Sequence, residues 1–494
     1  MRLTRRRFLV LGGAAGLTGG AALVSGTANP RGAETPAAAP ATGPYVTMPE
    51  LRPPAMSARR GGVPEKGLLF VGPFRGTAHA DGLIVDDEGE PVWMRPSQLT
   101  ITDLRVQEYE GRPVLTYWEG ERRTGGYGWG NGIILDTSYR KIAEVRAGGG
   151  AGVHVDLHEF RLTDRGTALI VAYPLVRADM RAVGGPRDGH VFDNRVQEID
   201  IRTGRVLFDW SALEHIDIAE TVTPLADNAD GTDGKPFDPV HVNSVEADGD
   251  ALLLSARNTS ALYRIDRRTG RIRWRLGGTH GDFELGEGVE FHWQHDARRR
   301  PDGTITLFDN AITEKETGSS RGIALKVDER AGTADLVWEY TDDVTFAHYM
   351  ANMQILPGGN VLLGYGSTAS VIEYTPGGDV VYELKTGQSS YRAYRHAWTG
   401  RPETPPLVAS RPVSGGMRLY ASWNGATEVA AWRFLTGPSA SRLSPATTVR
   451  RSGFETSAKV DRAASAVAVA LDAHGAELGR SAPLSTRDGA NTAV

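Results

Sequence analysis

Ile265-Asp266-Arg267-Arg268-Thr269-Gly270-Arg271-Ile272-Arg273-Trp274 is the clearest copy of a unit that recurs along this sequence. In the full copies a strand ends in an aspartate, a glycine turn follows, and the next strand ends in an aromatic residue. The marker position falls at residues 86, 136, 200, 266 and 328, with a degenerate copy at 375. These spacings are at or above the roughly 40 to 50 residues of a four-stranded propeller blade, so the longer units carry insertions. Six units predict six blades.

A second kind of strand pair lies between these hairpins. It covers residues 157–160 with 169–171, 242–245 with 252–254, 295–297 with 305–307, and 353–355 with 361–363. We expect these to be inner strands of the blades, with their starts facing a central channel. A large β-sandwich is the alternative, but the long repeat favours a propeller. The predicted fold class is therefore all-β, with a six-bladed β-propeller catalytic domain over residues 65–400.

Two different segments are expected to flank the propeller. Prolines at positions 402, 405 and 406 end the repeat, and residues 401–494 have the length and turn spacing of a small immunoglobulin-like or fibronectin-like β-sandwich. Residues 35–64 are a Pro/Ala-rich leader. Residues 1–34 hold the cluster Arg5-Arg6-Arg7 and a weakly hydrophobic Gly/Ala-rich run, which is the pattern of a twin-arginine signal peptide and the start of the leader.

This amino-terminal pattern predicts a secreted protein. The apolar run is too short and too rich in glycine to cross about 30 Å of hydrocarbon, so we expect no stable membrane span after cleavage. The chain has no cysteine, which excludes disulfides and thiolate chemistry and is compatible with export in the folded state. The formal net charge is only -5, and Lys and Arg are spread along the chain, so no nucleic-acid partner is expected.

Three histidines stand at the starts of predicted inner strands: His158, His241 and His295. Equivalent positions of neighbouring blades converge on one channel mouth, so these imidazoles are expected to share a pocket. A single histidine at a strand end is more often a hydrogen-bonded structural residue. Three at equivalent places favour a functional site.

Two further residues point to the chemistry of that site. Arg257 follows the hairpin that contains His241, and its planar donors suit a tetrahedral oxyanion such as sulfate or phosphate. Asn243 lies two residues after His241, so strand alternation puts its amide on the same side. Such a cluster can hold a transition metal, or it can transfer an oxyanion through a histidine nucleophile. Because a metal cation would repel Arg257, we expect neither a metal nor a cofactor.

Four stretches resemble the bacterial arylsulfotransferase family, the cofactor-independent aryl-sulfate sulfotransferases. They are Asp156-Leu157-His158-Glu159-Phe160, His241-Val242-Asn243-Ser244, Ser255-Ala256-Arg257-Asn258, and Gln294-His295-Asp296 with Asp302-Gly303 to Phe308-Asp309-Asn310. The similarity covers roughly residues 65 to 395. The absence of cysteine and the C-terminal β-domain indicate a divergent secreted branch of the family.

The resemblance implies a six-bladed propeller that moves a sulfuryl group from an aryl sulfate donor to a phenolic acceptor by a ping-pong route through a sulfated histidine. It implies that His295 is the nucleophile. It further implies that His241, Asn243 and Arg257 hold the sulfuryl oxygens, and that His158 assists at the phenol oxygen. The expected partners are these small molecules.

Two other functions remain open at this point. Residues 266–274 resemble the tryptophan docking motif of quinone-dependent propeller dehydrogenases, although that motif ties strands together and reports the fold more than the function. A non-catalytic binding propeller is the other alternative, which the three histidines disfavour. An ordinary sulfatase is the alternative that the sequence favours least, because its formylglycine requires a cysteine or a Ser-x-Pro-x-Arg motif that the chain lacks.

Overall fold

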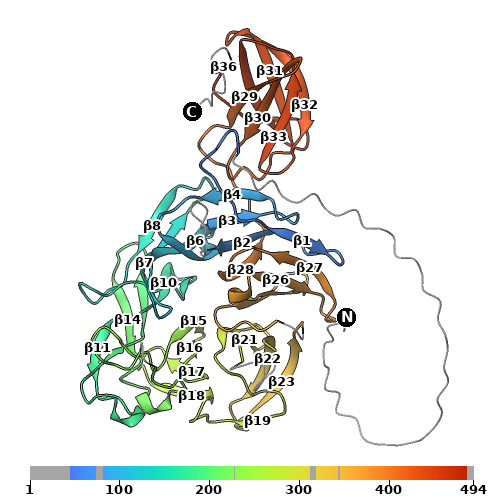
Figure 1. Cartoon of the computed structure of the whole chain (residues 1–494). Coiled ribbons are helices and arrows are strands. Elements are labelled where there is room, and N and C mark those ends of the chain that lie inside the picture. The colour runs from blue at the N-terminus through green and yellow to red at the C-terminus, as the bar shows by residue number, and fades with distance from the viewer. Residues whose placement is uncertain (1–44, 74–81, 227–228, 312–318, 343–344, 487–494) are drawn as a thin grey trace, which may run out of the picture.

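The computed structural model describes residues 45–73, 82–226, 229–311, 319–342 and 345–486 (Figure 1). The expected signal peptide and the first part of the leader lie outside these residues. The described part of the chain is all-β and contains no α-helix. Its helical turns are three short 3₁₀ helices, η1 (Arg181–Val183), η2 (Ile218–Glu220) and η3 (Gly366–Thr368). Within the described ranges, no helix has the length and apolar character needed to cross a membrane.

Residues 57–396 form six sheets of four or five strands, and the hydrogen-bonded order of each is as follows. The first is β28 (Ser390–His396), β2 (Leu68–Pro73), β3 (Gly82–Val85) and β4 (Pro91–Arg95), and the second is β5 (Thr100–Tyr109), β6 (Arg112–Arg122), β7 (Gly128–Leu135) and β8 (Lys141–Val145). The third is β9 (Phe160–Leu162), β10 (Thr167–Ala172), β13 (Arg195–Asp200) and β14 (Val206–Ser211). The fourth is β15 (Val242–Asp248), β16 (Ala251–Ala256), β17 (Ala261–Asp266) and β18 (Ile272–Gly277).

The last two sheets each gain an extra strand. The fifth is β20 (His295–Arg299), β21 (Ile305–Asp309), β22 (Arg321–Asp328) and β23 (Thr333–Tyr340), with β19 (Glu284–Leu285) parallel to β23. The sixth is β24 (Asn352–Ile355), β25 (Val361–Gly364), β26 (Ser370–Tyr374) and β27 (Val380–Lys385), with β1 (Ser57–Arg60) outside β27. A separate ribbon, β11 (Leu175–Ala178) and β12 (Gly189–Phe192), is inserted between β10 and β13.

The repeated turn marks the same hairpin in every one of these sheets, the one that joins the third strand to the fourth. In the clearest copies, Oδ1 of Asp200 accepts a hydrogen bond from the Thr203 N–H at 2.7 Å, and Oδ1 of Asp266 accepts one from the Thr269 N–H at 2.7 Å. An aspartate that satisfies the backbone of its own turn stabilises the reversal of the chain. The repeat in the sequence is thus a repeat of hairpin chemistry.

Each of the six sheets packs on the next through a buried apolar cluster. Strand β16 illustrates the two-sided burial: Leu252 and Leu254 belong to the cluster shared with the third sheet, whereas Leu253 belongs to the one shared with the fifth. Alternate residues of a strand point to opposite faces, so a continuous apolar run can serve both neighbours. The remaining clusters join the first sheet to the second, the second to the third, the fifth to the sixth, and the sixth to the first.

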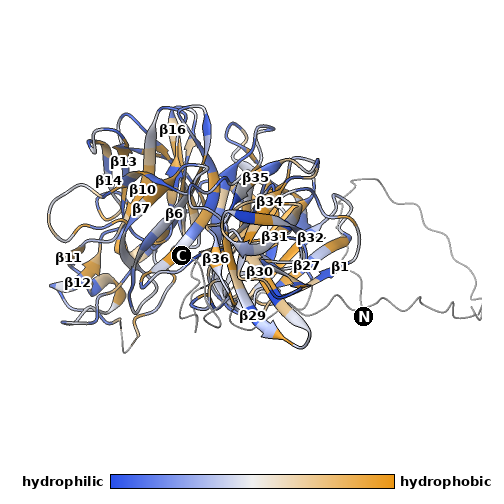
Figure 2. Ribbon diagram, turned by 90° about the horizontal axis from the view of Figure 1, so that it is seen from above, coloured by the Kyte–Doolittle hydropathy of each residue, from blue (hydrophilic) through white to orange (hydrophobic). Residues whose placement is uncertain are grey.

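The C-terminal residues form two further sheets. One is β29 (Leu407–Val413), β30 (Gly416–Ser422) and β33 (Glu455–Val460). The other is β32 (Arg442–Arg450), β31 (Ala431–Ser439), β34 (Ser465–Leu471) and β35 (Glu477–Arg480), with β36 (Leu484–Ser485) paired to β34. Residues of both sheets share one apolar core, and apolar residues run along strands in both parts of the molecule (Figure 2).

This C-terminal part lies against the edge strand β4 of the first sheet (Figure 1). The side chain of Asn424 accepts from the Met94 N–H and donates to the Met94 C=O, both at 2.8 Å. The Gly425 N–H donates to the Val92 C=O at 2.9 Å. The residues after β30 therefore occupy hydrogen-bonding groups that an edge strand would otherwise leave open.

The described part of the expected leader is ordered. Strand β1 pairs with β27, and Tyr45, Leu51 and Met56 are buried in the apolar cluster between the sixth and first sheets. Both oxygens of Glu455 accept backbone N–H groups of Val46 and Thr47, which ties the segment to the C-terminal part. The sequence predicted a Pro/Ala-rich leader over residues 35–64, and in its described part a few large apolar side chains dock it on the sheets.

Candidate active site

One cavity of about 650 Å³ brings together four of the five predicted site residues. His158, His241, Arg257 and His295 all line it, although they come from three different sheets. His158 lies just before β9, His241 just before β15, Arg257 just after β16, and His295 begins β20. The starts of the inner strands therefore converge as the sequence predicted.

The ring of His295 is held in one tautomer. Its Nδ1 lies 2.7 Å from Oδ1 of Asn310 and 3.0 Å from the Trp293 C=O, and both of these oxygens are acceptors. The Asn310 amide cannot turn over, because its Nδ2 donates to the carbonyls of Ala347 and Met350 at 2.7 and 2.9 Å. Nδ1 must therefore carry the hydrogen, and Nε2 keeps its lone pair.

The surroundings of His295 also keep the ring uncharged. Burial, followed by the positive charge of Arg257 and the nearby His158, lowers the pKa of His295 well below its usual value. Asn310 opposes this shift only weakly, since an amide oxygen is neutral. A neutral imidazole with a free Nε2 is the form that can act as a nucleophile.

The other two histidines are backed by carboxylates. Nδ1 of His158 lies 2.5 Å from Oδ1 of Asp156, and Nδ1 of His241 lies 2.6 Å from Oδ2 of Asp238. The two rings meet edge to face, with centroids 4.6 Å apart. Burial lowers the pKa of His241, while Asp238 counteracts this. A carboxylate partner orients each of these rings, which distinguishes them from His295, whose partner is a neutral amide.

Arg257 makes no direct ion pair among the described residues: Asp238, which lines the same cavity and raises the pKa of Arg257, is bound to His241. The Arg257 guanidinium lies over the Trp293 ring at 4.1 Å and donates to Oδ1 of Asn258 at 2.8 Å, while its Nε has no hydrogen-bond partner within the described part. Burial lowers its pKa to about 10, which still leaves it charged at neutral pH. A buried charge is costly unless it is paired, so this position favours an anionic ligand.

The fifth predicted residue, Asn243, does not reach the cavity. It is fully buried, and its Nδ2 donates to the C=O of Gln294 at 2.8 Å. The expectation from strand alternation is wrong here because the backbone is irregular: His241 has φ of 59°, and the pairing of β15 shifts register between Val242 and Ser244. Asn243 instead fixes the peptide that leads into His295.

Three residues that support the histidine rings were not assigned a role from the sequence: Asp156, Asp238 and Asn310. The two aspartates precede their histidines by two and three residues, a local spacing from which they could have been chosen. Asn310 lies 15 residues after His295 and reaches it only across the pairing of β20 with β21. Within the described ranges, no group of three or more histidine and acidic side chains is arranged to hold a metal ion.

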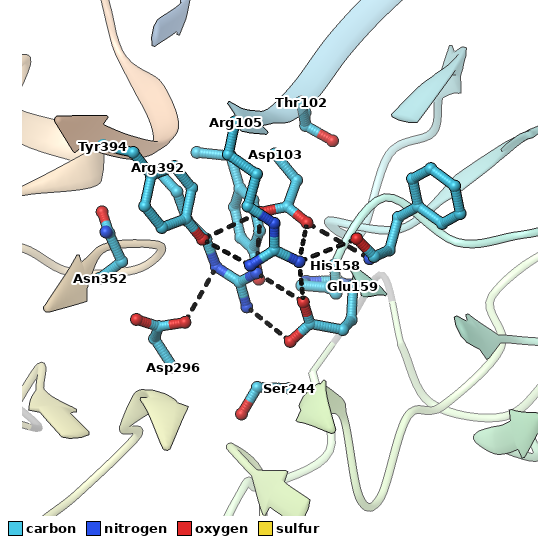
Figure 3. Close-up of polar contacts among 12 residues, drawn as sticks. Thr102, Asp103, Arg105, His158, Glu159, Ser244, Asp296, Asn352, Arg392 and Tyr394 are labelled. Atoms are coloured by element: carbon cyan, nitrogen blue, oxygen red, sulfur yellow. Dashed lines mark hydrogen bonds and ion pairs between the residues drawn. The ribbon is translucent and has the colours of Figure 1, made fainter. Parts of the chain in front are cut away.

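A network of six buried charges lies next to His158 (Figure 3). Glu159, next to His158, contacts Arg105 at 2.7 Å, Arg298 at 2.6 Å and Arg392 at 3.0 Å. Asp103 and Asp296 complete the set: Asp103 lies 2.9 Å from Arg392, and Asp296 lies 2.6 Å from Arg298. Burial would raise the pKa of Glu159, but the three guanidinium groups lower it well below its usual value. The network links four sheets next to the residues that carry the rings.

We expect Glu159→Gln to destabilise the protein by about 3–5 kcal/mol, because it leaves three buried guanidinium groups short of one negative charge. Glu477→Gln is the matched control, since Glu477 pairs with Arg480 on the surface and such a pair contributes at most about 1 kcal/mol. Denaturant unfolding of the three proteins measures both changes. Equal midpoints for Glu159→Gln and the unchanged protein would contradict a stabilising network.

A second, larger cavity of about 850 Å³ touches the same network through Arg105, Asp296 and Arg298. It contains none of the three clustered histidines. Six arginines and six acidic residues line it, so its charges balance. The smaller cavity contains Arg257, which makes no direct ion pair among the described residues, and the neutral ring of His295, so it is the better candidate for the active site despite its size.

Comparison with known proteins identifies the family. Residues 105–387, more than half of the chain, match the family described as Arylsulfotransferase (ASST). The chain therefore belongs to the arylsulfotransferase family and is an enzyme of that class, which takes the place of the dehydrogenase and binding-protein alternatives. No curated protein matches the chain.

Solved structures match only distantly. A protein of unknown function from Bacteroides caccae has a TM-score of 0.40 and 12% identity, over 67% of this chain and 98% of that one. The β-propeller domain of Swd1 from Myceliophteria thermophila has a TM-score of 0.30 and 11% identity, over 66% and 97%. An inactive virginiamycin B lyase from Staphylococcus aureus has a TM-score of 0.29 and 8% identity, over 86% and 97%. Scores of this size carry no inference about this chain.

Proposed function

We propose that this arylsulfotransferase moves a sulfuryl group from an aryl sulfate to a phenol by a ping-pong route, with a covalent sulfohistidine at His295. The observation that carries the proposal is the pairing of a neutral imidazole, fixed with its hydrogen on Nδ1 by Asn310, with the cation Arg257 in the same cavity. The imidazole of His295 supplies the nucleophile. Arg257 stabilises the negative charge on the sulfuryl group that this imidazole attacks.

In the first half-reaction, the lone pair on Nε2 of His295 attacks the sulfur of the donor. The bond between sulfur and the phenol oxygen breaks, and its electron pair leaves with that oxygen. His158, paired with Asp156, delivers a proton to the departing oxygen, while Arg257 and His241 hold the sulfuryl oxygens. Asn243 acts indirectly: its amide holds the carbonyl of Gln294, the residue that precedes His295.

In the second half-reaction, the first phenol has left and an acceptor phenol occupies its place. His158 removes the acceptor proton, the phenol oxygen attacks sulfur, and the bond from sulfur to Nε2 breaks. The electron pair returns to His295, which is neutral again. Because the same residues serve both halves, no nucleotide donor and no bound cofactor take part in this scheme.

The architecture proposed for the enzyme is a six-bladed propeller, residues 65–400, followed by an immunoglobulin-like or fibronectin-like sandwich, residues 401–494. Six sheets in chain order, each packed on the next and the last on the first, support the propeller. Two sheets around one core support the sandwich. The amino-terminal sequence supports export through the twin-arginine route and a secreted mature protein.

A single assay tests the proposed function. The protein is incubated with a chromogenic aryl sulfate and no nucleotide sulfate, with and without added phenol, and release of the chromogenic phenol is followed. Release that rises with the acceptor concentration, together with formation of the acceptor sulfate, is the expected result. Equal release with and without acceptor would indicate hydrolysis and contradict transfer.

The rate of the first half-reaction should be insensitive to pH around the usual pKa of histidine. Because the pKa of His295 is lowered well below 6.5, the ring stays neutral as the pH falls through that value and is protonated only further down. Single-turnover sulfation of the protein measures this, with a donor whose phenol leaves easily, so that proton delivery does not limit the rate. A rate that halves near pH 6.5 would mean that the nucleophile is an ordinary histidine.

A further inference from the structure

The cavity is much larger than the transfer of a sulfuryl group between simple phenols requires. Cavities of 300–1,000 Å³ bind drug-sized ligands, and this one has a volume of about 650 Å³. The three histidines and Arg257 make up only part of its lining. The rest of its lining determines which aryl groups fit.

A row of aromatic rings in contact begins beside His158. The ring of Tyr173 lies 5.6 Å from that of His158, Phe192 follows at 6.2 Å from Tyr173, and Tyr127 follows at 4.5 Å from Phe192. Phe192 and Tyr127 both line the cavity and form part of its wall. In the row that begins beside His158, Phe192 is the second ring and Tyr127 the third. This wall is available to a second aromatic ring of a substrate.

The wall is built by segments that are additional to the four-stranded sheets. Phe192 ends the inserted ribbon β11–β12, and Tyr127 lies in the connection between β6 and β7. Phe237 also lines the cavity and is hydrogen-bonded to the ribbon. Its C=O accepts from the Phe192 N–H at 2.9 Å, and its N–H donates to the His190 C=O at 3.0 Å. The insertion has a small core of its own around Met180, Val191, Ile218 and Phe237. It therefore presents a preformed apolar face, which costs little to order on binding.

We infer, on the basis of the proposed function, that the substrates of this enzyme are phenols and aryl sulfates with two or more aromatic rings. The ring that carries the reacting oxygen lies beside the histidines, and the second ring packs against Phe192 and Tyr127. Aromatic pairs prefer centroid distances of about 4.5–7 Å in offset or edge arrangements, which is the spacing of the existing row. Tyr127 and Phe192 thus select the substrate.

The test compares acceptors in the full-length protein: phenol, 2-naphthol and 4-phenylphenol, whose hydroxyl groups have similar acidity. With one donor, kcat/KM is expected to be at least about tenfold higher for the two-ring acceptors, from the apolar area that the second ring buries. Phe192→Ala and Tyr127→Ala should each reduce this ratio severalfold. Phe192→Leu, which keeps an apolar side chain and reduces the risk of unfolding, should reduce it less.

Leu175→Ala is the control, since Leu175 lies on the same ribbon with 53% of its surface exposed and outside the cavity lining. It should leave the ratio unchanged. Equal kcat/KM for one-ring and two-ring acceptors in the unmodified protein would overturn the inference, as would variants that lower both values to the same extent.

Failure of the proposed function can be told apart from failure of this inference. If the protein transfers no sulfuryl group at all, the equilibrium dissociation constants of 2-naphthyl sulfate and phenyl sulfate still show whether the aromatic wall favours a second ring. Tighter binding of the naphthyl ester, with the advantage reduced in Phe192→Ala, supports the inference. Equal binding of the two esters overturns it.

Discussion

His295→Ala is expected to abolish transfer between aryl sulfates and phenols. The substitution removes a neutral ring whose Nδ1 hydrogen is held by Asn310, so that its Nε2 lone pair is available for attack. His158 and His241 have other roles in the proposed scheme, at the phenol oxygen and at the sulfuryl oxygens, and each is hydrogen-bonded to a carboxylate instead of an amide. Loss of a covalent nucleophile in comparable enzymes costs on the order of 10⁶-fold in kcat. Steady-state release of a chromogenic phenol in the presence of acceptor measures the effect.

The control for this variant is His474→Ala, which changes an exposed histidine of the C-terminal part. It should have no effect on the rate. If His295→Ala turned over near the unmodified rate, the nucleophile would be another residue, and His241 is the next candidate because it lines the same cavity.

Arg257→Ala should lower kcat/KM by about 10²- to 10³-fold, the usual cost of losing one group that stabilises a transferring oxyanion. The kcat/KM of Arg257→Lys should fall between that of Arg257→Ala and that of the unmodified protein. Lysine keeps the charge but loses the planar fork and the contact of the guanidinium with the Trp293 ring. Rapid-mixing measurements of the first half-reaction give the rate constants.

Arg401→Ala is the matched control, because Arg401 is an exposed arginine already paired with Glu428. Its activity should equal that of the unmodified protein. Full activity in Arg257→Ala would show that the sulfuryl charge is held elsewhere, and would leave this cation in the cavity without a role.

The sequence predicted those features of the fold and site that depend on local chemistry. The turn at Asp266 recurs because one side chain can satisfy its own turn, so the hairpins could be located from the repeated aspartate and glycine. The convergence of His158, His241 and His295 followed from the repeat, since equivalent positions of stacked sheets come close in space. The partners Asp156 and Asp238 lie within three residues of their rings and carry the same kind of local signal.

What the sequence did not predict depends on irregular backbone or on distant contacts. Asn243 was expected in the cavity, but a register shift in β15 and the positive φ of His241 break the alternation on which that expectation relied. The link between Asn310 and His295 depends on the register of β20 with β21, for which no local pattern exists. Burial of Leu51 beneath the last and first sheets depends on chain segments more than 300 residues apart.

The central claim, a sulfuryl group carried by His295, is tested most directly by isolating the intermediate. The unmodified protein is mixed with an aryl sulfate in the absence of acceptor, quenched in base to protect the bond between nitrogen and sulfur, digested and examined by mass spectrometry. The account predicts one added sulfuryl group per chain, on the peptide that contains His295, and its disappearance when phenol is added before the quench. A sulfuryl group on a different residue, or turnover with no modified peptide at any time, would contradict it.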